Sequence, residues 1–281
     1  MSADLAAMIR AACVWEATAR KAGNVHPQRD FADLTYLDFL VSAYAIAPVL
    51  AEDVPVGERV LQAIRATRKV VATNTNLGIV LLLAPLAAVP TKLPLRAGVE
   101  VILRNLDVAD SRAVFAAIRI VAPGGLGAAQ SQDVRDEPTL PLRDVMALAQ
   151  DRDLIARQYA NGFADVFDLG VPTLLDAFQR WHDLETAIQW AHLHWLAALP
   201  DSLILRKRGR AEADEATRRA REVLASGWPD TSRDTYDSFD AWLRAEGHAR
   251  NPGASADLVA ACLFVALREG SLPHDTPMRR A

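Results

Sequence analysis

Residues 79–89 are almost wholly apolar, and a segment of this kind is normally buried in a globular protein. Directly before it, residues 73–78 read Thr-Asn-Thr-Asn-Leu-Gly, and residues 57–71 show a second helical pattern. The sequence therefore predicts two helices whose connection carries amide and hydroxyl groups to the edge of the core. Buried polar groups need partners. These partners are either backbone groups of a simple helix–turn–helix connection or a ligand.

The rest of the chain also has helical rather than strand character. Ala, Leu and Arg dominate, and alternating runs of β-branched residues are scarce. Helices are expected over residues 4–19, 35–50, 57–71, 79–89, 95–104, 110–121, 142–163, 182–199, 212–224, 239–246 and 255–268. Asp110 or Ser111 is expected to cap the sixth of these, and Ser255 the last. No repeat or long linker divides the chain, so we predict one all-α domain, a multi-helix bundle over residues 1–281.

Composition narrows the function classes. The formal net charge is -4 and the pI is about 5.9, which argues against the basic face of a nucleic-acid-binding protein. Cys13 and Cys262 lie in apolar surroundings and are expected to be reduced core residues. No signal peptide is recognised, and the apolar runs are too short to span a membrane. We expect a cytoplasmic protein whose partners are small molecules, with neither nucleic acid nor membrane, and a homo-oligomer is possible.

Polar residues gather in five groups, each beside an apolar helical segment. The groups are Glu16 with Lys21, Gly23, Asn24 and His26; Arg29 with Asp30 and Asp33; residues 74–78; residues 201–209 with Arg206, Lys207 and Arg208; and Asn251-Pro252-Gly253 with Asp257. A carboxylate at Glu16, near the buried face of the first helix, either pairs with Lys21 or Arg20 or serves in catalysis. The three cations at 206–208 suit a polyphosphate, and a solvated charge run is the alternative.

Two other patterns lack the features that a ligand site of their kind requires. Residues 124–127 read Gly-Gly-Leu-Gly, but no Gly-Lys-Ser/Thr follows and no strand precedes, so they form neither a P-loop nor a dinucleotide fingerprint. His192 and His194 are two residues apart and point to different sides of a helix. Together with His182, we expect them to pack against the tryptophans at 181, 190 and 195 rather than to bind a metal.

The five groups occur in the order found in the triphosphoribosyl-dephospho-CoA synthase family, which this chain resembles over most of its length. The matching motifs are Glu16 followed by Lys21-x-Gly23-x-Val25; Asp30-Phe31 leading to Phe39-Leu40-x-Ser42-Ala43; Thr73-Asn74-Thr75-Asn76-Leu77-Gly78; Asp201-Ser202-x-Ile204-x-Arg206-Lys207-x-Gly209; and Asn251-Pro252-Gly253-x-x-Ala256-Asp257-Leu258.

The resemblance implies an all-helical enzyme that joins the ribose triphosphate of ATP to a hydroxyl of 3′-dephospho-CoA and releases adenine. The product is the precursor of a prosthetic group on acyl-carrier proteins. The resemblance also implies a catalytic carboxylate among Glu16, Asp30 and Asp33. Nucleotide or phosphate contacts are expected from Lys21, Asn24, His26, Asn74, Thr75, Asn76, Arg206, Lys207 and Arg208. Asp201 and Asp257 are expected to hold Mg²⁺.

One departure from the family pattern bears on the substrate. Better-known members read Asn-Thr-His-Lys-Gly where this chain has Asn-Thr-Asn-Leu-Gly at residues 74–78, and their Lys-Pro-Gly is Lys-Ala-Gly at residues 21–23. A changed phosphate or base contact is expected. The alternatives are a family member of another cofactor pathway, such as methanopterin-type coenzyme synthesis, a nucleotide-binding protein without turnover, and a purely structural helical protein.

Overall fold

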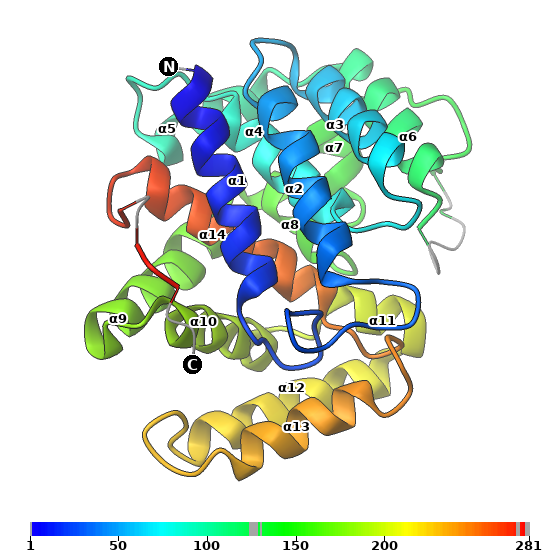
Figure 1. Cartoon of the computed structure of the whole chain (residues 1–281). Coiled ribbons are helices and arrows are strands. Elements are labelled where there is room, and N and C mark those ends of the chain that lie inside the picture. The colour runs from blue at the N-terminus through cyan, green and yellow to red at the C-terminus, as the bar shows by residue number, and fades with distance from the viewer. Residues whose placement is uncertain (1, 124–128, 130, 274–275, 279–281) are drawn as a thin grey trace.

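A computed structural model of the chain describes residues 2–123, 129, 131–273 and 276–278. These residues form helices and loops without a strand, apart from two isolated bridges, His26–Arg29 and Phe31–Leu34. The all-α prediction is confirmed (Figure 1). The helices are α1 (Ser2–Thr18), α2 (Tyr36–Leu50), α3 (Val56–Val70), α4 (Leu77–Ala87), α5 (Leu95–Arg104), α6 (Val108–Val121), α7 (Leu142–Ala147), α8 (Leu154–Asn161), the π-helix η1 (Val166–Gly170), α9 (Val171–Trp181), α10 (Leu184–Ala198), α11 (Ser202–Arg208), α12 (Arg210–Ala225), α13 (Asp234–Arg244) and α14 (Gly253–Arg268).

Two apolar helices form the centre of the molecule. α14 runs behind α1 in Figure 1 and packs against α1, α4, α9 and α10. Its residues 258–267 are all buried, as are residues 79–87 of α4. Each fully buried Leu or Ile side chain contributes about 1.5–3 kcal/mol, so these two runs supply much of the stability of the core. Within the described residues, no helix has the length and apolar character to cross a membrane.

A second apolar cluster includes side chains of α12 and α13, the two helices drawn at the bottom of Figure 1. It joins these two helices to α10 and α11 through buried side chains such as Leu196, Ile204 and Phe239. The loop between α1 and α2 is tied to the same unit, because the backbone N–H of Gly23 donates to Asp240 at 2.7 Å. The single domain over residues 1–281 stays a prediction.

The long helix predicted over residues 142–163 is wrong, because the chain forms two helices there, α7 and α8. The carboxylate of Asp153 accepts hydrogen bonds from the backbone N–H groups of Ile155 and Ala156, at 2.9 and 3.0 Å, and so caps α8. An aspartate in this position competes with a continuous helix. The pattern of apolar residues continues through the break, so periodicity alone did not reveal it.

Other helix ends also differ from the prediction by a few residues. Asp107, not Asp110 or Ser111, caps α6, and Asp110 completes the capping box. α14 begins at Gly253, so Ser255 lies inside its first turn. Residues 202–208, which the sequence pattern indicates only as a polar group, form the short helix α11. The glycine-rich residues 124–127 lie outside the described residues.

Candidate functional site

Two neighbouring cavities open beside the N-terminal end of α4. The larger has a volume of about 420 Å³ and the smaller about 90 Å³. They share one wall, to which the α3–α4 connection, α4, α11 and α14 contribute; it consists of Asn74, Leu77, Gly78, Leu203 and Asp257. Small-molecule sites commonly have roughly 300–1,000 Å³. The larger cavity alone is therefore of substrate size, and the smaller one extends it.

The smaller cavity is lined by polar side chains from distant parts of the chain. They come from α1, from the loop after it, from the α3–α4 connection and from the segment that begins α14: Glu16, Asn24, Asn74, Thr75, Asn76, Asn251 and Asp257. Polar side chains of three of the five groups of the sequence thus meet in one hollow, with two carboxylates among them.

Glu16 is held in this hollow by a buried ion pair. The Lys21 Nζ lies 2.9 Å from the Glu16 Oε1, and the two side chains are 0% and 4% exposed. The same ammonium donates to the backbone carbonyls of Glu16 and Ala19. Its three hydrogens therefore have protein acceptors. Lys21 positions the catalytic candidate Glu16, and the structure gives it no free hydrogen for the phosphate contact predicted from the sequence.

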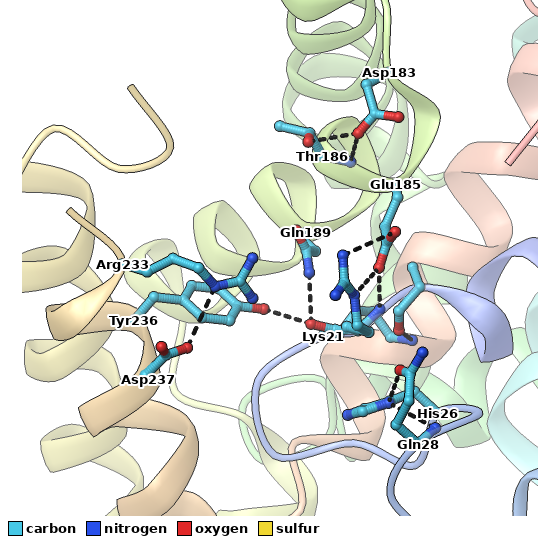
Figure 2. A network of polar contacts seen from close by, with 12 residues as sticks. Lys21, His26, Gln28, Asp183, Glu185, Thr186, Gln189, Arg233, Tyr236 and Asp237 are labelled. Carbon is cyan, nitrogen blue, oxygen red and sulfur yellow. Dashed lines mark hydrogen bonds and ion pairs between the residues drawn. The ribbon is translucent and has the colours of Figure 1, made fainter. Parts of the chain in front are cut away.

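The loop that carries Lys21 is fixed by α10 and α13. The backbone carbonyl of Arg20 accepts hydrogen bonds from the Gln189 amide and from the Tyr236 hydroxyl, both at 2.7 Å, and the Arg20 guanidinium pairs with Glu185 at 2.6 Å. Figure 2 labels these three partners, Gln189, Tyr236 and Glu185. Two helices that lie outside the cavities thus hold the residue before Lys21 in place. This arrangement preorganises the Glu16 carboxylate.

Asp257 lies in the shared wall of the two cavities. Its carboxylate makes no hydrogen bond or ion pair within the described residues. It lies so close to Gly78 that a Cβ at position 78 would be 2.0 Å from the Asp257 Oδ2. Burial, followed by the neighbouring carboxylate of Glu16, raises the pKa of Asp257 well above its usual value. A bound cation or a hydrogen-bond donor would stabilise the charged form.

The α3–α4 connection keeps its shape through two side chains that were predicted to bind nucleotide. The Asn76 amide donates to the Thr67 hydroxyl at 3.0 Å. The hydroxyls of Thr75 and Ser42 share a hydrogen bond of 2.7 Å. Both residues line the smaller cavity, but their main hydrogen bonds run to the protein. They fix the turn that presents Asn74 and Gly78 to the cavities.

Amide groups with unused hydrogen-bonding capacity remain in the site. The Asn24 Nδ2 donates to the Asn251 Oδ1 at 2.6 Å, while the Asn24 Oδ1 is buried without a partner. The Asn74 Oδ1 accepts from the N–H of Leu77 at 3.2 Å, and its NH₂ group has no partner within the described residues. An unsatisfied buried polar group costs about 1–3 kcal/mol, so a ligand hydroxyl that donates to the buried Asn24 Oδ1 would gain affinity, whereas the exposed NH₂ group of Asn74 can also bond to water.

Comparison with known proteins identifies the relatives of this chain. The model of the CitG family, described as ATP:dephospho-CoA triphosphoribosyl transferase, matches residues 2–275. This chain belongs to the CitG family. A crystal structure from Archaeoglobus fulgidus, provisionally named a triphosphoribosyl-dephospho-CoA synthase, is similar with 27% identity and a TM-score of 0.66 over 82% of this chain and 99% of that one. A comparison with curated proteins found no match. The resemblance predicted from the motifs is confirmed.

Within this CitG-family fold, Asp201 has a structural position. One of its carboxylate oxygens accepts from the N–H groups of Leu203 and Ile204, at 2.8 and 3.1 Å, and caps α11. The other accepts from the N–H and the hydroxyl of Ser255, both at 2.8 Å, and so ties α11 to α14. Asp201 lines neither cavity. The predicted metal contact of Asp201 is therefore not supported, because its oxygens are already used.

The three adjacent cations of α11 diverge. Arg206 lines the larger cavity, its Nη1 is 4.0 Å from the Asp153 Oδ2, and its Nε is buried without a partner. This loose pairing leaves Arg206 able to contact an anion. Of the cations at 206–208, it alone is among the described residues that line a cavity.

Lys207 and Arg208 face other parts of the protein. The Lys207 ammonium donates to the carbonyl of His248 at 3.3 Å, and burial lowers the pKa of Lys207. Arg208 pairs with Glu212 at 3.1 Å and with Glu246 at 2.8 Å. The phosphate contacts predicted for these two residues are not supported, because a helix turns successive side chains in different directions.

The carboxylates and the histidine of the α1–α2 loop also lie outside the cavity walls. Asp30 accepts from the backbone N–H of Tyr36 at 2.7 Å, and Asp33 lies 3.4 Å from His248 with its side chain 59% exposed. Burial, with help from Arg244, lowers the pKa of His26 to about 4, so its ring is neutral at pH 7. Neither the catalytic role predicted for Asp30 and Asp33 nor the nucleotide contact predicted for His26 is supported by these positions.

The histidines of α10 do not form a metal centre. His194 packs against Trp190 with ring centroids 4.5 Å apart, as predicted. His192 is fully buried, and this burial lowers its pKa to about 3. In the part of the chain that the structure describes, no three His, Cys, Asp or Glu side chains converge as metal ligands.

Sequence reasoning missed most of the larger cavity. Its apolar lining includes Phe115 on α6, Met146 on α7 and Ala156 on α8. In the sequence these residues look like ordinary core positions, since periodicity shows that a side chain points inward and not what space it borders. Asn251 was recognised as part of a motif, but its pairing with Asn24 depends on the tertiary fold.

Proposed function

We propose that this chain transfers the ribose triphosphate of ATP to a hydroxyl group of dephospho-CoA and releases adenine, which makes it a pentosyltransferase. The observation that carries the proposal is that a chain matched by the CitG family over residues 2–275 gathers two carboxylates and several amides in one polar hollow beside a substrate-sized cavity. The polar hollow suits hydroxylated groups, and its carboxylates suit a reaction that develops positive charge on a sugar.

The two carboxylates have different surroundings and support different roles. Transfer breaks the bond from the ribose C1′ to adenine and forms a bond from C1′ to the acceptor oxygen, and positive charge develops on the ring in between. Glu16 carries a fixed counter-ion in Lys21, and in this proposal its charged carboxylate accepts the proton of the attacking hydroxyl. Asn24 and Asn74 have unused donors or acceptors for sugar hydroxyls.

Asp257 is proposed to contact the magnesium ion that accompanies ATP. Mg²⁺ is commonly held by only one or two carboxylates, and phosphate oxygens and water supply its other ligands. Asp257 fits this arrangement because its carboxylate lacks a counter-ion in the described chain. When bound, Mg²⁺ would offset the charge of the triphosphate. Arg206, which lines the larger cavity, is proposed to contact the phosphates.

The proposal is tested by incubating the purified chain with ATP, magnesium and dephospho-CoA, and by measuring adenine by chromatography and the joined product by mass spectrometry. Glu16→Gln keeps the shape of the side chain, loses its charge and is expected to lower the rate by about 100-fold or more. Asp30→Asn is the matched control and is expected to retain activity, since Asp30 lines neither cavity. Absence of adenine release by the wild type would refute the proposal.

A further inference from the structure

Apolar side chains line much of the larger cavity, and charged side chains line another part of it. The larger one is enclosed mainly by apolar side chains of four helices, among them Leu81, Phe115, Met146 and Ile155. Its shared wall with the smaller cavity carries two polar side chains, Asn74 and Asp257. The smaller cavity has Glu16 and further amides. A ligand group that packs against these apolar side chains is expected to be uncharged, since burying a charge against them is costly, whereas Arg152 and Arg206 of the same cavity are available to phosphate groups.

A direct displacement at a sugar carbon needs room on two opposite sides of that carbon. The nucleophile approaches C1′ on the face opposite the leaving base, so the base and the attacking hydroxyl lie on opposite sides of the reacting carbon. Two cavities that meet at one wall provide such sides if C1′ lies at that wall, next to Gly78 and Asp257. Gly78 permits the close approach of the Asp257 carboxylate to the backbone at this wall, because a side chain at position 78 would collide with that carboxylate.

The side chains that line each cavity then indicate which ligand group it binds. We infer that the larger cavity binds the adenine ring of the ATP donor, and that the smaller cavity receives the hydroxyl-bearing part of the acceptor. The assignment rests on the proposed function. The bond between C1′ and the adenine nitrogen breaks with its electron pair going to adenine, which takes a proton from solvent. The acceptor oxygen bonds to C1′, and its proton goes to the Glu16 carboxylate, while the triphosphate stays on the ribose.

Leu77 supports the same assignment, because it lines both cavities. Better-known relatives have lysine at this point of the motif, as their Asn-Thr-His-Lys-Gly shows against residues 74–78. A leucine in the shared wall adds apolar surface beside the larger cavity and contributes no charge. An uncharged aromatic ring is compatible with this wall, whereas the phosphate groups of either substrate would find no cation from residue 77 there.

The test uses free adenine, ATP, tripolyphosphate and dephospho-CoA as separate probes in equilibrium binding. The wild type is expected to bind adenine, and ATP is expected to displace it. Ala149→Phe places a ring in the wall of the larger cavity. It is expected to weaken adenine and ATP binding by at least about tenfold, with tripolyphosphate and dephospho-CoA binding changed less than about twofold. Ala147→Phe is the matched control, because Ala147 lines neither cavity.

Adenine that does not bind, or that only dephospho-CoA displaces, would overturn the assignment, as would an Ala149→Phe variant that loses dephospho-CoA binding alone. If this variant does not fold, crystals of the wild type soaked with adenine decide the question: density between α6, α7 and α8 supports the inference, and density elsewhere refutes it. Failure of the proposed function is a separate result, since adenine binding is measured without turnover. A chain that binds adenine as described but never releases it from ATP would keep the inference and lose the activity.

Discussion

Replacing Gly78 by alanine separates helix propensity from the geometry of the site. In a helix, alanine is ordinarily about 1 kcal/mol more favourable than glycine. In this protein the added Cβ would lie 2.0 Å from the Asp257 Oδ2, whereas ordinary contact begins at 3.4 Å. The carboxylate must therefore move away from the shared wall, and overpacking of this kind costs about 1–3 kcal/mol. The net change expected for the free energy of unfolding is a loss of up to about 2 kcal/mol.

The same substitution is expected to have the opposite sign when Asp257 is already alanine, because the obstacle is gone. Urea unfolding of the four proteins of this double-mutant cycle measures the coupling, which we expect to be about 1–3 kcal/mol. Adenine release by Gly78→Ala is expected to fall by at least about tenfold, since the carboxylate leaves its place. A gain of about 1 kcal/mol in both backgrounds would refute the close approach of Asp257 to residue 78.

Lys21→Met should destabilise the fold by about 3–5 kcal/mol by leaving a buried carboxylate unpaired, and adding Glu16→Leu should recover much of this loss in urea unfolding; no recovery would contradict the pairing. The pKa of His192 is lowered to about 3 by burial, so as pH falls below the unfolded value of about 6.5 the unfolded state gains a proton that the folded state lacks. Stability should therefore fall by up to about 1.4 kcal/mol per pH unit below that value, and His192→Leu should reduce the slope of urea midpoints between pH 6 and 4; an unchanged slope would count against the buried neutral ring. Arg206→Ala should raise the KM for ATP by about tenfold, while Arg208→Ala, with its partners on α12 and after α13, should leave it unchanged; equal effects in steady-state kinetics would contradict the divergence of the two side chains.

Helices were predictable here because apolar spacing is a local property. Residues 79–89 and 255–268 were expected to be buried helices, and α4 and α14 form the core. The break between α7 and α8 was missed, because it depends on whether Asp153 folds back on the next turn or points to solvent. The sequence is compatible with both conformations of Asp153, and tertiary packing selects one of them.

The candidate site was predictable in its residue types and not in its pairings. The sequence suggested that Glu16, Asn74 and Asp257 serve one site, and the structure places all three around the smaller cavity. The sequence did not show that Glu16 and backbone carbonyls accept all the hydrogen bonds of Lys21. Nor did it show that both oxygens of Asp201 accept hydrogen bonds at the N-terminal ends of α11 and α14. Such partners lie far apart in sequence or depend on a loop conformation, so charge type alone does not reveal which groups remain free for a ligand.

A crystal structure with ATP and magnesium tests the central claim most directly, namely that the two cavities and their shared wall form one ribosyl-transfer site. The account predicts that the ribose C1′ lies against Gly78 and Asp257, with the base toward α6 and α8. A nucleotide bound on a different surface, for example along Arg208 and α12, would contradict it.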